Sequence, residues 1–234
     1  MSVAGLRRVS HKGADAVATG NTVASFTAAA ELGVEMIELD VLRLRDRRLV
    51  VAHDYHDAER REPLSLTEAL DAFTRPPLDA VEIDLDLKLP GRESEVHRAL
   101  RERGLIERSM VSTMEITSLE RLREIDPELR LGWTYPKVSR DWSRARLARP
   151  AVLVALVAMR RRLPRIAARA LPRLAVKAIW VYHALATRRL VHTAESSGVE
   201  VIAWTVDDLE RMRALAALGV HGICSNDPRL FAEL

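Results

Sequence analysis

The chain has 234 residues, which suits one large α/β domain, and 48% of them are apolar, enough for a sizeable core. Its single cysteine, Cys224, excludes an internal disulfide and a zinc site built from paired cysteines. No apolar stretch reaches the roughly 18 residues of a transmembrane helix, and the first residues lack the apolar segment of a signal peptide. We therefore expect a cytoplasmic protein that is either soluble or bound peripherally to the inner face of the membrane.

The charges are unevenly distributed along the chain. Residues 142–194 contain 12 Lys/Arg and no Asp/Glu, although the net charge of the whole chain is only +3. The remainder therefore carries a charge of −9, and such an acidic surface repels nucleic-acid phosphates. We expect no nucleic-acid partner.

Strand and helix patterns alternate along the chain. A strand is expected over residues 6–10, followed by a helix over 21–32 with Asn21 or Thr22 as its N-cap. The later strands are expected over 36–44, 49–53, 80–88, 110–113, 131–135, 176–182, 199–205 and 222–224. The later helices are expected over 65–73 (opened by a capping box from Ser65 to Glu68), 93–103, 117–125, 187–196 and 208–218, with a short one after 227.

This alternation predicts an α/β fold with a parallel sheet, and the length suits a TIM (β/α)8 barrel. The ninth strand, 49–53, is expected to pair with 36–44 as a hairpin. An open doubly wound sheet is the structural alternative, but its Gly-rich phosphate loop after the first strand is missing. We expect a single domain over 1–234, with a basic helical insertion at about 142–174.

Reactive side chains of such barrels lie at the C-terminal ends of the strands. Here those ends carry His11 and His53, the pair Glu38 and Asp40, and then a strand with Asp84, Asp86 and Lys88 at every second position. Side chains two residues apart on a strand share a face. Placing two carboxylates side by side is costly unless a cation lies between them, and oxygen ligands suit Mg²⁺ or Ca²⁺.

The third carboxylate of the expected metal site is either Asp84 or Asp86. Lys88, on the same face, can hold a substrate anion as a point charge. A single strand-end histidine is most often structural, but the two histidines, the carboxylate pair and the lysine on consecutive strands predict a catalytic site.

The chain resembles the glycerophosphodiester phosphodiesterase family in two blocks that together span residues 6 to 230. The opening block consists of His11-Lys12-Gly13, Asn21-Thr22, Glu38-Leu39-Asp40-Val41 and Val50-Val51-Ala52-His53-Asp54. The closing block consists of Ala203-Trp204-Thr205-Val206, Leu218-Gly219-Val220-His221-Gly222-Ile223 and Asn226-Asp227-Pro228.

The resemblance implies a TIM barrel that uses one divalent cation, Mg²⁺ or Ca²⁺, to hydrolyse glycerophosphodiesters to glycerol 3-phosphate and an alcohol. It implies the following roles: an acid/base pair of His11 and His53, metal ligands Glu38, Asp40 and Asp86, and substrate contacts by Lys12, Lys88 and Trp204. It leaves open which histidine is the acid, and whether water or a substrate hydroxyl attacks, the latter giving a cyclic product.

The chain departs from the family pattern at three positions. Lys12 stands where an arginine is more common, and Gly20 replaces the glutamate of a Glu-Asn-Thr motif. Asp86 is one methylene shorter than the usual glutamate two residues before Lys88. These departures leave two alternatives for the function: a lysophospholipase D or sphingomyelinase D-like activity on membrane lipids, or a barrel without catalysis.

The basic segment allows two interpretations. In the first, it is a helical connection that packs Val152, Leu153, Leu156 and Val157 on the barrel and leaves its arginines in solvent. In the second, it binds peripherally to an anionic membrane, which would favour a lysophospholipid substrate over a small soluble phosphodiester.

Overall fold

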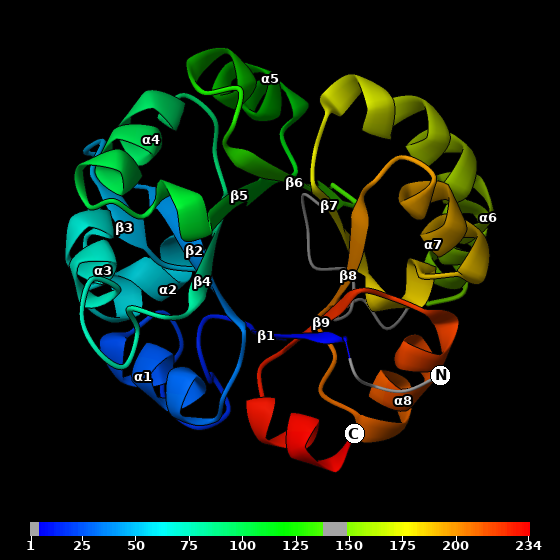
Figure 1. Ribbon diagram of the computed structural model, residues 1–234, viewed down its shortest axis with the longest axis horizontal. Helices are drawn as coiled ribbons and strands as arrows, with labels where there is room; N and C mark the ends of the chain where they lie inside the picture. Colours follow the sequence, from blue (N-terminus) through cyan, green and yellow to red (C-terminus); the bar gives the residue numbers. More distant parts are fainter. Residues whose placement is uncertain (1–4, 138–148) are drawn as a thin grey trace.

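The computed structural model describes residues 5–137 and 149–234, in which eight parallel strands form a closed ring inside a layer of helices (Figure 1). The ring consists of β1 (Arg7–Ser10), β2 (Met36–Arg43), β4 (Glu82–Leu87), β5 (Ser109–Thr113), β6 (Arg130–Tyr135), β7 (Ala178–Tyr182), β8 (Glu200–Trp204) and β9 (Gly222–Ser225). β1 closes the ring because it pairs with both β9 and β2. The predicted TIM barrel is confirmed.

The remaining strand, β3 (Leu49–Val51), lies outside the ring. It pairs antiparallel with the end of β2, with Val41 opposite Val51, as the predicted hairpin requires. β1 ends at Ser10 and covers only the start of β2, opposite Met36 and Ile37. The far end of that edge of β2 is therefore open to β3.

The helices connect the strands in the expected order: α1 (Val23–Glu31), α3 (Leu66–Ala72), α4 (Glu93–Glu102), α5 (Ile116–Ile125), α6 (Arg149–Leu174), α7 (Arg188–Glu195) and α8 (Leu209–Leu218). Thr22 is the N-cap of α1, and the capping box between Ser65 and Glu68 opens α3, both as predicted. The six-residue helix α2 (Tyr55–Arg60) was not predicted, because it buries no side chain and so shows no apolar periodicity.

The basic segment contributes the longest described helix, α6, which joins β6 to β7 (Figure 1). Its first part, residues 142–148 of the expected insertion, lies outside the described residues. The second half of α6 packs on the barrel through Leu163, Ala167, Leu171 and Leu174, all buried. The expected packing of Leu153 and Val157 is wrong: these side chains are 63% and 43% exposed. Leu156 is partly buried against the core.

The barrel interior is apolar at one end and polar at the other. A compact cluster fills the first half of the barrel, and it consists of Val9, Met36, Met110, Ala178, Trp180, Ile202 and Cys224. Toward the C-terminal ends of the strands, the barrel interior is lined by polar side chains. None of the helices in the described ranges combines the length and the apolar character that crossing a membrane requires.

Candidate active site

A cavity of about 140 Å³ opens at the C-terminal ends of the strands. Six of the eight predicted site residues line it: His11, Glu38, His53, Asp86, Lys88 and Trp204. Glu38 comes from within β2, and the other five come from the C-terminal ends of β1, β3, β4 and β8 or the residues just after them. Asp40 lies beside this lining, and Lys12 points elsewhere.

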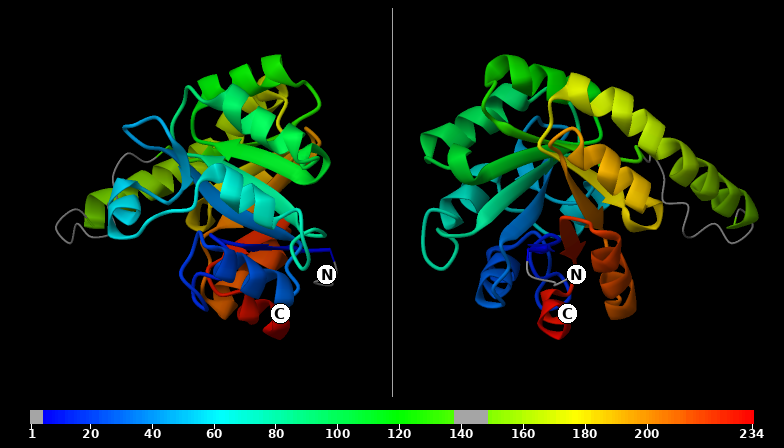
Figure 2. Two further views of the ribbon diagram at one scale, coloured as in Figure 1. Left: turned by 90° about the vertical axis from the view of Figure 1, so that its left-hand side faces the viewer. Right: turned by 45° about the vertical axis from the view of Figure 1, so that its right-hand side comes forward.

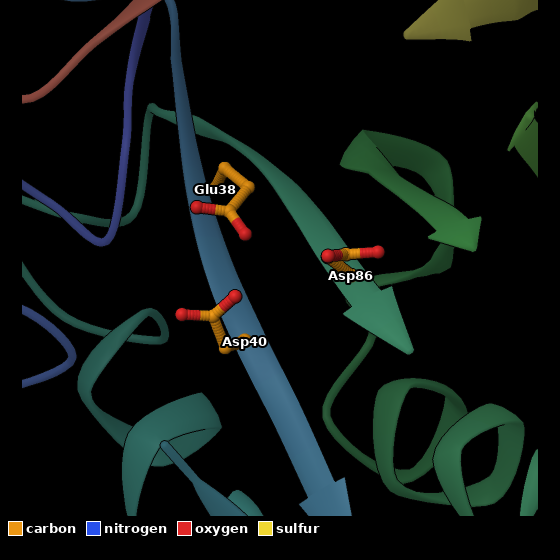
Figure 3. A group of neighbouring side chains, drawn as sticks. All are labelled: Glu38, Asp40 and Asp86. Carbon is orange, nitrogen blue, oxygen red and sulfur yellow. The ribbon is translucent and has the colours of Figure 1, made fainter. Parts of the chain in front are cut away.

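Three carboxylates form a cluster on one side of the site. Glu38 and Asp40 project from β2 toward Asp86 on the neighbouring strand β4 (Figure 3), and one oxygen of each lies within 4.8 Å of the others. The strand register places Asp40 directly opposite Asp86. All three are buried, and this set of hard oxygen donors fits Mg²⁺ or Ca²⁺. The cluster can therefore hold a divalent cation.

The sequence left Asp84 and Asp86 as alternatives, and they differ in their surroundings. Asp84 lies opposite Glu38, lower in the barrel, where Ser112 donates a hydrogen bond of 2.7 Å to its carboxylate. Burial raises the pKa of Asp84 well above its usual range. Asp86, one step nearer the mouth, belongs to the carboxylate cluster, whereas Asp84 does not.

Lys88 supplies the positive charge of the site. Its ammonium group contacts the carboxylates of Asp40 and Asp86. Burial alone would lower the pKa of Lys88, but the surrounding carboxylates outweigh burial and raise it well above its usual range. Lys88 is therefore a permanent cation at the edge of the cluster.

The same charges separate the two carboxyl groups of β2. Burial opposes ionisation of Asp40, but Lys88 and the two histidines outweigh it and hold the pKa of Asp40 well below its usual range. Burial, and then the Asp40 charge, raise the pKa of Glu38 well above its usual range. Without a bound cation, Asp40 thus ionises more readily than Glu38.

Asn21 fixes the orientation of Asp40, a role that the sequence analysis missed. Its amide nitrogen donates to Asp40 Oδ2 at 2.7 Å, and its amide oxygen accepts from the Asp40 backbone N–H at 3.1 Å. Asn21 has a left-handed backbone with φ of 58°, a conformation that asparagine adopts more readily than most residues. The hint in the sequence was an asparagine just before the N-cap Thr22.

His11 is buried and held by a chain of hydrogen bonds from the closing block. Its Nδ1 lies 2.7 Å from Asn226 Oδ1, while the Asn226 amide nitrogen donates to Asp207 at 2.6 Å. The bond to Asp207 directs the amide oxygen toward His11, so Nδ1 is the donor and the neutral ring carries a free Nε2. This Nε2 lies 3.9 Å from Glu38. Burial lowers the pKa of His11.

His53 lies at the rim of the same cavity, with 52% of its side chain exposed. The unpredicted helix α2 holds it in place. Its backbone N–H donates to Asp57 of α2 at 3.1 Å, and its Nδ1 lies 3.3 Å from the N-cap residue Asp54. The two histidines thus differ: one is buried and the other is open to solvent.

Lys12 does not line the cavity, because its ammonium group pairs with Asp15 at 2.6 Å. The other oxygen of Asp15 accepts from the Gly20 N–H at 2.7 Å. A Cβ atom at Gly20 would lie 2.5 Å from that oxygen, so a larger residue there would displace the Asp15 carboxylate. Asp15 therefore fills the space beside Gly20, but it lies outside both the cavity lining and the carboxylate cluster. The Lys12 backbone still contacts the site, because its N–H donates to Glu38 at 2.9 Å.

The opposite wall of the cavity is aromatic. Trp180 and Trp204 line it, and Tyr182 meets Trp204 edge to face with ring centroids 5.9 Å apart. Cys224 also lines the cavity, but burial raises the pKa of its thiol well above the usual range. The cysteine is therefore a neutral wall residue and not a nucleophile.

A parallel barrel with carboxylates, a lysine and two histidines around one cavity defines the class: the chain is a TIM-barrel hydrolase of the phosphodiesterase type. The sequence model of the glycerophosphoryl diester phosphodiesterase family matches residues 11–74 and 81–230. The chain belongs to this family.

Individual relatives agree over almost the whole length. The chain is 25% identical to a glycerophosphodiester phosphodiesterase of Caldanaerobacter subterraneus subsp. tengcongensis, covering 97% of this chain and 96% of the relative. A glycerophosphodiester phosphodiesterase of Parabacteroides distasonis has a similar structure (TM-score 0.74, 16% identity, 98% of each chain). So has an Oleispira antarctica phosphodiesterase in complex with the product sn-glycerol-3-phosphate (TM-score 0.71, 18% identity, 97% of this chain and 95% of that one). At these identities the structural likeness shows the shared fold.

Proposed function

We propose that the protein hydrolyses glycerophosphodiesters to glycerol 3-phosphate and an alcohol, with one divalent cation and two histidines. The observation that carries this proposal is the cavity lined by Glu38, Asp86, Lys88 and two histidines, with Asp40 completing the buried carboxylate cluster beside it. The names of the relatives support the substrate class, as does the glycerol 3-phosphate bound to the Oleispira antarctica phosphodiesterase.

In this proposal Glu38, Asp40 and Asp86 hold Mg²⁺ or Ca²⁺. The bound cation would neutralise charge that develops on the phosphoryl oxygens. Lys88, already a permanent cation beside Asp40 and Asp86, contributes a further positive charge for the substrate phosphate. Lys12 acts indirectly, through the orientation of Glu38.

The two histidines provide the proton transfers. One imidazole accepts a proton from the attacking hydroxyl group, and the other donates a proton to the leaving alkoxide. The lowered pKa of His11 favours its neutral form, in which Nε2 is free to accept a proton. In this assignment His53, at the rim of the same cavity, is the proton donor to the leaving alkoxide. Trp204 and Trp180 form the apolar wall against which the glycerol or alcohol group packs.

Single substitutions of the histidines test the mechanism. His11→Ala and His53→Ala should each lower kcat on glycerophosphocholine by about 10²-fold or more, because acid/base assistance contributes about 10²–10⁴-fold. EDTA should abolish activity, and Mg²⁺ or Ca²⁺ should restore it. His56→Ala is the matched control, because His56 is an exposed histidine of α2 that does not line the cavity. Wild-type rates in both cavity variants, with unchanged circular dichroism, would refute the proposal.

A second candidate function is the hydrolysis of lysophospholipids, or a sphingomyelinase D-like reaction that gives a cyclic phosphate. The exposed apolar and basic half of α6 favours a lipid-derived substrate. Product analysis separates the two. The products are identified by phosphorus NMR. If the principal proposal holds, glycerophosphocholine should give glycerol 3-phosphate. If the second candidate holds, lysophosphatidylcholine or sphingomyelin should give a lysophosphatidic acid or a cyclic phosphate.

A further inference from the structure

A wide groove separates the middle of α6 from the start of α7 and has a volume of about 630 Å³. We refer to it as the arginine groove. Its lining consists of Val157, Arg160, Arg161, Pro164 and Arg165 of α6, with Thr187 and Arg189 at the start of α7. Four of these seven residues are arginines, and no carboxylate is among the described residues that line it. The groove is therefore complementary to an anionic surface.

Exposed apolar side chains continue the arginine groove along α6. Leu153, Val154 and Val157 are 63%, 70% and 43% exposed, which is unusual for three large aliphatic residues so close together. The helical spacing of Leu153, Val157 and Arg161 puts these residues on the side of α6 that borders the groove. One face of the helix thus combines bare aliphatic groups with arginines, the composition of an interfacial helix.

This face lies at the end of the barrel that contains the active site. Thr187, in the groove lining, is the N-cap of α7 and follows the C-terminal end of β7. α6 likewise starts from the C-terminal side of β6 and runs back along the barrel. Figure 2 shows the first turns of α6 projecting past the barrel, at the same end as α2, which holds His53.

We propose that the arginine groove and the apolar face of α6 dock the protein on an anionic phospholipid bilayer. The arginines bind lipid phosphates while Leu153, Val154 and Val157 insert between the head groups. Residues 142–194 carry a charge of +12, whereas the rest of the chain carries −9. An anionic bilayer therefore attracts the four arginines of the groove, while the net negative charge of the rest of the chain disfavours other contacts, and this orients the catalytic mouth toward the lipid surface. The docking surface is separate from the proposed catalytic residues.

Co-sedimentation with vesicles tests the docking. The wild-type protein should bind vesicles of phosphatidylglycerol at low salt, release at high salt, and bind pure phosphatidylcholine vesicles weakly. Arg160→Glu with Arg161→Glu should lower the partition coefficient by roughly tenfold or more. The matched control is Arg169→Glu with Arg173→Glu, which makes the same charge change at exposed positions of α6 outside the groove and should retain most of the binding.

A separate variant tests the contribution of the exposed apolar side chains to vesicle binding. Leu153→Ser with Val154→Ser should weaken binding even at moderate salt, whereas Ile166→Ser, at another exposed aliphatic position of α6, should not. Equal losses in the groove and control variants would overturn the proposal, as would salt-insensitive binding. So would equally tight binding to duplex DNA, or release of the protein from vesicles by millimolar inorganic phosphate. Because binding is read without turnover, its failure is distinct from failure of the proposed reaction.

Discussion

At the scale of single residues, the active site depends on side chains that touch no candidate ligand. Asn226 and Asp207 set the tautomer of His11, and Asn21 sets the direction of the Asp40 carboxylate. Such supporting hydrogen bonds typically change affinity or activity by 10- to 100-fold when they are removed. Asn226 and Asn21 are therefore positioning residues. Substituting them should change the properties of His11 and Asp40, the side chains that they orient.

Asn226→Ala should lower kcat by roughly 10- to 100-fold with little change in KM, because His11 loses its orientation. The hydrogen bond that His11 donates to Asn226 raises the pKa of His11, so its loss should lower that pKa further. NMR titration of the imidazole checks this, with His192, exposed on α7, as an internal reference. An unchanged His11 titration together with unchanged kcat would contradict the assignment.

Residue-level sequence reasoning identified the groups that carry charge, because strand ends and the alternation along a strand place them at one mouth. Glu38, Asp86 and Lys88 lie together as expected. The roles of Asn226 and Asp15 could not be predicted in this way. The bond between His11 and Asn226 joins residues 215 positions apart, and Asp15 both pairs with Lys12 and accepts from the Gly20 N–H. Spacing contains no information on such contacts.

At the scale of elements, α6 divides into a half that stabilises the barrel and a half that does not. Leu171 is 1% exposed on the second half, whereas Leu153 is 63% exposed on the first. Leu171→Ala should lower the free energy of unfolding by about 2–5 kcal/mol, because it leaves a cavity in the core. Leu153→Ala should change it by less than about 0.5 kcal/mol. Urea unfolding measures both, and equal losses would show that the first half is also packed.

Most strands and helices were predictable because alternating or helical apolar patterns mark buried faces. Two elements illustrate the limits. The helix α2 lies on the surface and is held by the polar side chains of Asp54 and Asp57, so it has no apolar pattern to detect. The helix α6 continues through Pro164 and Pro172, although proline disfavours helix interiors. Its buried leucines on the barrel side compensate, and this tertiary effect is not visible locally.

At the scale of the whole molecule, we expect the carboxylate cluster to couple stability to pH and to a divalent cation. The pKa of Glu38 is higher in the folded protein than its ordinary value of 4.5. Its contribution to stability is therefore fully present below about pH 4.5 and is lost as the pH rises through the folded pKa. Without a cation the protein should become less stable from that pH toward neutrality, and a divalent cation should reverse the loss.

Glu38→Gln removes this titration. In EDTA at pH 7.5, the variant should therefore have a higher Tm than the wild type, and the difference should shrink toward pH 4.5. Millimolar Mg²⁺ or Ca²⁺ should raise the Tm of the wild type by several degrees, because a cation at 100 times its Kd stabilises the folded protein by about 2.7 kcal/mol. The same cations should raise the Tm of the variant less. Scanning fluorimetry across pH measures all of these. A variant that melts below the wild type in EDTA at every pH would contradict the assignment.

The closure of the ring by β1 has a consequence for biosynthesis. His11 follows the first strand, and its partner Asn226 follows the last, so the two meet only when β9 has paired with β1. While the chain emerges from the ribosome, the carboxylates on β2 and β4 can assemble early, but the imidazole stays unsupported until nearly the whole barrel has been made. Catalytic competence should therefore arise in one late step, and a nascent chain stalled before β9 should be inactive.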